Sequence, residues 1–393
     1  MALFSVAPVG SMGIFVEHRT PQHINFYRRF KYSSPAQMNV LVFLFMRVVR
    51  VLPISSHLRR SERLFVLLLL HCIAVKFSPA LGIEMSSKVQ ITPIGPQLDL
   101  GEGPHWEAKT ETLYYVDAFA ATVHRHVPHT NEHSYCKFKG NTVSFVIPVE
   151  GKEESEFVIG LEREIVHVIW DLKSDKPTAT RVLSAAEEDR GGNRVNDGKV
   201  DPAGRLWTGT LMPGQGLDDA PFTSHLYSFD KGSSPKKHLS GIAVSNGLAW
   251  SLDHKAFYYI DSLKYKVQGF DYDITNGTIN NERTVFDLKK NNVEGIPDGM
   301  TIDSEGKLWV AVYTGGKVIR IDPDTGKLLY TLPIPSWEVT SVVFGGPNLD
   351  ELYVTSANKI KNNPKDKFPQ PGQTFKVTNL GVRGTPSRSI KLQ

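Results

Sequence analysis

The sequence predicts an all-β fold, a six-bladed β-propeller, preceded by an N-terminal extension that lies outside that fold. Three observations carry this prediction. From residue 85 onward, short β-branched or aromatic runs alternate with turns rich in Asp, Gly and Pro. No long segment of this region has helical periodicity. A short polar phrase also recurs four times, at spacings typical of four-stranded repeat units.

The recurring phrase fixes the number of units. Its copies begin at Glu102, Asn196, Asn246 and Asp298, separated by 94, 50 and 52 residues. The first interval is about twice the others, so we expect a diverged unit within it, at residues 141–170. A further unit begins at Thr340, 42 residues after Asp298. Six units of this length indicate six propeller blades and place residues 85–393 in one domain.

The first residue of each copy has an oxygen-bearing side chain in a common register. Each stands five positions before a polar turn residue: Glu107, Asp201, Ser251 or Asp303. Innermost strands run along the channel of a propeller, so these side chains should form a ring at one channel mouth. Two carboxylates and two carboxamides suit one hard divalent cation, with Ca²⁺ first and Mg²⁺, Mn²⁺ or Zn²⁺ as alternatives. A single Asp-Gly or Asn-Gly pair would indicate only a turn.

Residues 1–84 differ in composition from the rest of the chain. They hold ten Lys and Arg against three Asp and Glu, which leaves the body with a net charge of −3 and no basic character typical of nucleic-acid binding. The apolar run at 64–75 is too short to span a membrane as a helix. Three interpretations stay open: a mispredicted or untranslated upstream region, a signal or short anchor, or a mitochondrial-type presequence.

Compartment and assembly follow from the same reading. Cys72 lies in the extension and Cys136 in the body, so the body cannot form an internal disulfide. We expect a monomeric propeller in the cytoplasm, with a secreted or membrane-anchored alternative if residues 64–75 act as a signal. Contact with a membrane is expected only if the extension is retained.

Six stretches of the body resemble a known family, and the likeness covers about residues 88–385. The stretches are 100–106 (LGEGPHW), 194–205 (RVNDGKVDPAGR), 245–251 (SNGLAWS), 257–262 (FYYIDS), 296–300 (IPDGM) and 306–311 (GKLWVA). Together they resemble the SMP-30/gluconolactonase/LRE-like family of regucalcins and gluconolactonases, and its animal regucalcin branch in particular.

This resemblance implies a function and a set of site residues. It implies hydrolysis of sugar lactones, small-molecule substrates, with binding of one divalent metal ion, Ca²⁺ above others. By position, Glu102, Asn246 and Asp298 match the metal ligands, and Asp298 also matches the proton donor and acceptor. Arg194 and Asn196 match the residues that contact substrate. The alternatives are a calcium-binding regulatory protein without turnover, or an organophosphate or other ester hydrolase on the same ring.

One position departs from the family pattern. Vertebrate-like regucalcins carry a substrate-contacting Glu shortly after the second motif, and the aligned residue here is Gly214. This departure leaves the substrate preference open.

Two other groups of residues have simpler interpretations. Four histidines crowd one stretch without zinc-ligand spacing, and we expect them on an exposed strand and loop: His124, His126, His129 and His133. Four tryptophans recur at repeat positions, and we expect them to pack between strands: Trp106, Trp207, Trp250 and Trp309.

Overall fold

The computed structural model describes residues 88–187, 192–212, 220–230 and 234–392. These residues belong to one compact unit that comprises residues 86–393. Residues 1–84 and Gly214 lie outside the described residues, so the structure does not test the interpretations given for them.

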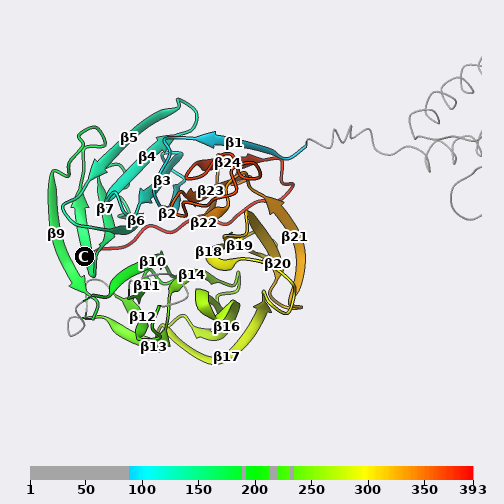
Figure 1. Ribbon diagram of the computed structural model, residues 1–393. Helices are drawn as coiled ribbons and strands as arrows, with labels where there is room; N and C mark the ends of the chain where they lie inside the picture. The colour runs from blue at the N-terminus through cyan, green and yellow to red at the C-terminus, as the bar shows by residue number, and fades with distance from the viewer. Residues whose placement is uncertain (1–87, 188–191, 213–219, 231–233, 393) are drawn as a thin grey trace, which may run out of the picture. The chain divides into compact units, whose positions relative to one another are not determined.

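The described chain forms six antiparallel sheets of four strands each, arranged around a central channel (Figure 1). The predicted six-bladed all-β propeller is therefore confirmed. The first three blades contain, in order, β2 (Gly101–Glu107), β3 (Thr112–Asp117), β4 (Thr122–Val127) and β5 (Glu132–Lys137); β6 (Val143–Pro148), β7 (Glu156–Leu161), β8 (Glu164–Ile169) and β9 (Ala179–Ala185); β10 (Arg194–Val200), β11 (Leu206–Leu211), β12 (Ser224–Phe229) and β13 (Lys236–Ile242).

The other three blades follow the same pattern, except that the last takes a strand from the opposite end of the domain. They contain β14 (Ser245–Trp250), β15 (Ala256–Asp261), β16 (Lys266–Asp273) and β17 (Thr278–Asp287); β18 (Ile296–Ile302), β19 (Leu308–Tyr313), β20 (Lys317–Asp322) and β21 (Lys327–Pro333); β22 (Glu338–Gly345), β23 (Glu351–Ala357), β24 (Thr374–Thr378) and β1 (Gln90–Ile94). The pairing of β1 with β24 closes the ring of blades, because it joins the first strand to the last. The diverged unit expected at 141–170 is the second blade.

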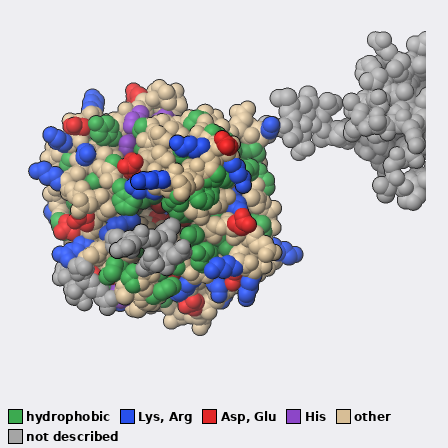
Figure 2. All heavy atoms as spheres, viewed as in Figure 1, with side chains coloured by type: hydrophobic (Ala, Val, Ile, Leu, Met, Phe, Trp, Pro, Cys, Tyr) green, Lys and Arg blue, Asp and Glu red, His purple; other side chains and the backbone are tan. Residues whose placement is uncertain are grey.

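Burial explains why the strand signals are nearly continuous apolar runs. Each blade is covered on both faces by its neighbours, so strands such as β3, β11 and β15 are buried at every position. The outermost strands lose this cover, and β13 and β21 are largely exposed. On the face shown in Figure 2, Lys and Arg side chains are scattered among Asp and Glu.

The polar turn residues of the repeat stabilise the end of each inner strand. Asp303 accepts hydrogen bonds from the turn amides of Glu305 and Lys307 at 2.9 Å, and from Trp309 Nε1 at 2.9 Å. Asp201 makes the same contacts, including 2.9 Å to Trp207 Nε1. The expected packing role of these tryptophans is confirmed, since both rings are buried in the core.

The C-terminal segment crosses the channel mouth at which the inner strands end (Figure 1). The amide of Ser304 donates to Arg383 O at 2.8 Å, and the amide of Ile390 donates to Pro148 O at 2.9 Å. The segment thus bridges the second and fifth blades. The mouth at the other end, where the inner strands begin, carries the residues of the predicted ring.

Candidate metal and substrate site

The inner strand of every blade is irregular near its start. In all six blades, the pairing of the innermost strand with its neighbour shifts register at this point. Such bulges turn side chains away from the regular alternation of a strand. One oxygen-bearing residue per blade stands at or beside the shift: Glu102, Ser144, Asn196, Asn246, Asp298 and Thr340.

Gly103 shows why this bulge requires a small residue. Its φ is +51°, in the left-handed region that favours glycine. A Cβ atom there would lie 2.9 Å from Phe145 Cα in the next blade. The close approach of the two blades at this point therefore depends on glycine directly after Glu102.

Hydrogen bonds link three predicted site residues across two blades. Arg194 Nη1 donates to Asn196 Oδ1 at 2.9 Å, and Asn196 Nδ2 donates to Asn246 Oδ1 at 2.7 Å. Asn196 Nδ2 also donates to Ser245 O at 2.8 Å. Asn246 Nδ2 is in turn oriented by Ser262 Oγ at 2.8 Å, which leaves its oxygen turned toward Asn196. Both N–H groups of the Asn196 amide are thus used within the protein, and its oxygen accepts from Arg194.

The two predicted carboxylates lie close enough to influence each other. Burial, followed by the charges of Glu102 and Asp197, raises the pKa of Asp298 well above its usual value. Burial and then the charge of Asp197 raise the pKa of Glu102 to about 8, against the smaller opposing effects of the Gly103 amide and Arg194. Only 7% of Asp298 is exposed, and its Oδ1 atom has no hydrogen-bond partner.

These observations fit a bound divalent cation. A buried carboxylate oxygen without a partner is costly, and a cation would both satisfy that oxygen and offset the mutual repulsion of the two acids. Among the described residues, no group of three or more His, Cys, Asp or Glu side chains could hold a metal ion. The predicted donors instead combine two carboxylates with the carboxamide of Asn246, a set of hard oxygen ligands.

Three residues that the sequence analysis did not single out adjoin the site. Ser144 Oγ lies 3.2 Å from Arg194 Nη1, and it belongs to the diverged blade whose copy of the phrase is lost. Asp197 and Lys199 follow Asn196 on β10, and the Nζ of Lys199 donates to Met300 O at 2.7 Å across the channel. Both were visible in the repeated phrase, but only the strand geometry turns them toward the channel interior.

The histidine stretch is more buried than expected. His124 and His126 are only 6% and 1% exposed, so the expectation of an exposed strand is wrong for these two residues. His124 stacks on Tyr115 within the first blade, and its Nδ1 lies 3.0 Å from His133 Nε2. Burial lowers the pKa of His124 to about 3, with a smaller effect from His133. His124 and His126 therefore belong to the core of the first blade, whereas His129 and His133 are exposed as expected.

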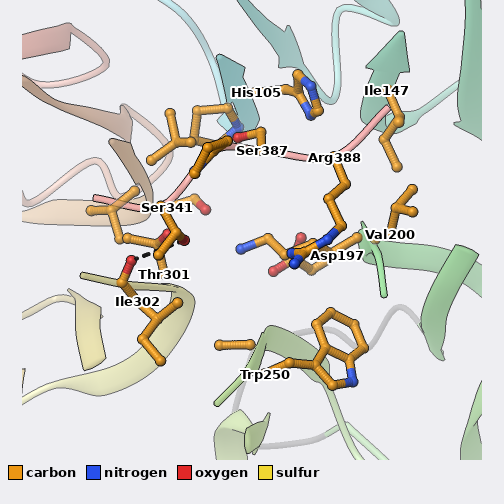
Figure 3. Close-up of a pocket in the computed structure, with 18 of the residues that line it drawn as sticks. His105, Ile147, Asp197, Val200, Trp250, Thr301, Ile302, Ser341, Ser387 and Arg388 are labelled. Carbon is orange, nitrogen blue, oxygen red and sulfur yellow. Dashed lines mark hydrogen bonds between the residues drawn. The ribbon is translucent and has the colours of Figure 1, made fainter. Parts of the chain in front are cut away.

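A cavity of about 360 Å³ lies farther along the channel, and Gly103 and Asp197, which follow the ring residues Glu102 and Asn196, are among the residues that line it (Figure 3). The middle and later parts of the inner strands form its walls, and Arg388 of the C-terminal segment also lines it. Glu102, Arg194, Asn246 and Asp298 do not line it.

In the described parts of the chain, we find no helix with the length and apolar character needed to cross a membrane.

Comparison with known proteins gives a consistent result. Residues 100–358 match the family described as the SMP-30/Gluconolactonase/LRE-like region. Regucalcin of Danio rerio is 42% identical over 295 residues, which cover 74% of this chain and 94% of that protein. Regucalcin of Homo sapiens is 42% identical over 289 residues, covering 72% of this chain and 92% of that protein.

A solved structure extends the comparison. The luciferin-regenerating enzyme is 45% identical, with a TM-score of 0.74, and the match covers 77% of this chain and all of that one. A bacterial regucalcin from Agrobacterium tumefaciens, at 24% identity and a TM-score of 0.67, shares the fold.

Proposed function

Because this chain belongs to the SMP-30/gluconolactonase/LRE-like family, we propose that it hydrolyses lactones with one divalent cation. Glu102, Asn246 and Asp298 would hold that cation, with Ca²⁺ as the first expectation. The observation that carries the proposal is the buried Asp298 Oδ1 atom without a partner, beside a second acid with a raised pKa. A structural role alone would not explain two neighbouring buried carboxyl groups with raised pKa values at the channel mouth.

The chemistry of lactone hydrolysis assigns a role to each residue. A water oxygen forms a bond to the carbonyl carbon, and the bond from that carbon to the ring oxygen breaks. When bound, the cation would polarise the carbonyl and make water more acidic. Asp298, in the carboxylate form that a neighbouring positive charge favours, accepts the proton of the attacking water and returns it to the ring oxygen.

Arg194 and Asn196 act on the substrate side of this proposal. Arg194 is fixed through Nη1 by Asn196 Oδ1 and Ser144 Oγ, so its other N–H groups can donate to substrate oxygens. Asn196 has both Nδ2 contacts within the protein, to Ser245 O and Asn246 Oδ1. We therefore assign it to positioning Arg194 and Asn246 rather than to direct recognition.

The names of the relatives support the proposal at different levels. Gluconolactonase appears in the family description, which favours lactone hydrolysis. The curated relatives are named regucalcin, which favours cation binding and motivates the alternative of a calcium-binding protein without turnover. An organophosphate or other ester hydrolase on the same ring is the second alternative. A sugar lactone as substrate, a monomeric state and a cytoplasmic location are further parts of the proposal.

An activity panel with metal exchange tests these alternatives. The full chain is stripped with a chelator, reloaded with Ca²⁺, Mg²⁺, Mn²⁺ or Zn²⁺, and assayed on aldonolactones and organophosphate esters. We expect lactone turnover that depends on added metal and is reduced at least about 100-fold by Asp298→Asn. Asp324→Asn, at a carboxylate that is 82% exposed, is the matched control. Calcium binding without turnover of any ester would support the regulatory alternative instead.

A further inference from the structure

Strand direction decides which loops border the candidate site. The inner strands begin at the ring of oxygen side chains, and neighbouring strands in a blade are antiparallel. The connections between the second and third strands therefore return to the ring mouth. Two of these connections are residues 118–121, between β3 and β4, and residues 358–373, between β23 and β24.

An exposed aromatic side chain stands on the first of these connections. Phe119 is 43% exposed, although it lies beside one of the predicted substrate residues. Its ring centroid is 5.9 Å from Arg194 Cζ. The turn that carries it is held firmly: Asp117 accepts from the amide of Asp99 at 2.8 Å, and the amide of Ala118 donates to Leu100 O at 2.8 Å.

A second cation approaches the same ring from the other connection. Lys359 Nζ lies 4.6 Å from the Phe119 centroid. The backbone of Lys359 is anchored, since its amide donates to Glu338 Oε2 at 2.9 Å. Glu338 also accepts from Tyr313 at 2.6 Å. Phe119 and Lys359 therefore form a fixed rim at the mouth, which we call the Phe119–Lys359 rim.

Lys359 carries the positive charge of this rim, whereas the charge of Arg194 is partly offset by the nearby Glu102 carboxylate. Among the described residues, no carboxylate pairs with the Lys359 ammonium group within 4.0 Å, and its nearest recorded partner is the Phe119 ring. The hydroxyl groups of a sugar lactone would gain little from an aromatic ring. An apolar ring on the substrate would cover the exposed part of Phe119, and an acidic substituent would meet the free ammonium group of Lys359.

We propose that the Phe119–Lys359 rim selects lactone or ester substrates that combine an apolar ring with a negatively charged group. This inference rests on the proposed lactone hydrolysis and names its substrate class. Phe119 contacts the apolar ring, and Lys359 pairs with the anionic substituent. Arg194 stays within the hydrolytic site, where it binds oxygens near the scissile bond.

Three lactones separate this inference from the proposed function. They are D-glucono-δ-lactone, dihydrocoumarin, and dihydrocoumarin with a carboxylate on its benzene ring, each assayed with the metal-loaded full chain. We expect the KM for the carboxylated compound to be about two- to fivefold lower than for plain dihydrocoumarin, and raised salt should remove that difference. Phe119→Ala should raise the KM of both aromatic lactones about fivefold, with kcat and gluconolactone turnover nearly unchanged.

Lys359→Met tests the charge separately, because it keeps an apolar side chain of similar length. It should abolish the advantage of the carboxylated lactone and leave plain dihydrocoumarin unaffected. Tyr330→Ala is the control for an exposed aromatic residue; Tyr330 lies on the outer strand β21 and is 40% exposed. Equal effects of Phe119→Ala on all three lactones, or no effect on the aromatic pair, would overturn the inference.

A binding measurement keeps the two proposals distinguishable. If no lactone is turned over, the proposed function fails, and calorimetry with the carboxylated dihydrocoumarin still tests the rim. Weaker binding by Phe119→Ala and Lys359→Met than by the unmodified chain would support the rim. Equal affinity in all three proteins would refute it.

Discussion

Replacement of Asp298 by Asn should stabilise the metal-free protein while abolishing its response to cations. Asp298 is almost fully buried, its Oδ1 has no partner, and Glu102 and Asp197 add negative charge nearby. Asn has nearly the same shape and no charge, so it removes the cost of ionising this carboxyl group. A residue that we propose to bind metal is thus expected to lower the stability of the metal-free fold.

The sign and size follow from the pKa of Asp298, which is raised in the folded state. A raised carboxyl pKa means that the folded state holds a proton which the unfolded chain releases. Binding of that proton stabilises the folded state fully when the pH is below the unfolded-state pKa of about 4. This stabilisation is lost as the pH rises toward the pKa of Asp298 in the folded state. The advantage of Asp298→Asn should therefore grow as pH rises above about 4, by at most about 1.4 kcal/mol per pH unit.

Urea unfolding followed by tryptophan fluorescence measures this difference at about pH 5 and pH 8, with chelator present. Ca²⁺ at about 100 times its Kd should then stabilise the unmodified protein by about 2.7 kcal/mol and leave Asp298→Asn unchanged. Asp324→Asn, at an exposed carboxylate, should resemble the unmodified protein throughout. The reasoning fails if Asp298→Asn is the less stable protein in chelator at pH 8, or if Ca²⁺ stabilises both equally.

Three further predictions concern the scaffold and the substrate side. Asp303→Ala should lower the free energy of unfolding, measured in urea, by about 3–5 kcal/mol. The substitution leaves the buried Trp309 Nε1 donor without a partner and removes a carboxylate that binds the Arg320 guanidinium. A loss below about 1 kcal/mol would contradict this reasoning. Arg194→Lys should raise KM about tenfold with a smaller change in kcat, since a lysine cannot hold the 2.9 Å bond to Asn196 and reach substrate together; unchanged steady-state kinetics would count against it. Burial, and then nearby cations, lower the pKa of His238 to about 4, so the folded protein keeps this ring neutral while the unfolded chain takes up a proton below about 6.5. The folded state therefore loses stability as pH falls from about 6.5 toward 4. Unfolding from pH 7 to 4 should show a shallower acid decline for His238→Gln, and an identical slope would refute the assignment.

Local sequence determined the blade and the ring positions. Short β-branched and aromatic runs predicted the strands, and β3 and β15 are such strands, buried at every position. The repeated phrase also placed Asn196, Asn246 and Asp298 at matching positions, because a repeat in sequence becomes a repeat in space when each unit turns about one axis. Arg194, Asn196 and Asn246 accordingly form one hydrogen-bonded series.

Long-range contacts lay beyond this reasoning. The pairing of β1 with β24 joins the two ends of the domain, and no local pattern encodes such a pairing. Ser144 adjoins Arg194 although its blade has lost the phrase. Burial of His124 depends on the neighbouring strands of the first blade and on Tyr115, and not on its own spacing.

Only the tertiary structure decided which side chains surround the ring of oxygen-bearing residues at the channel mouth. Phe119 and Lys359 are separated by 240 positions in the sequence, yet the closed circle of blades brings Lys359 Nζ to 4.6 Å from the Phe119 ring. Sequence fixes the register of side chains along each strand, because strand geometry repeats with every unit. Which loops meet at the mouth depends on the closure of all six blades, and that is a property of the whole domain.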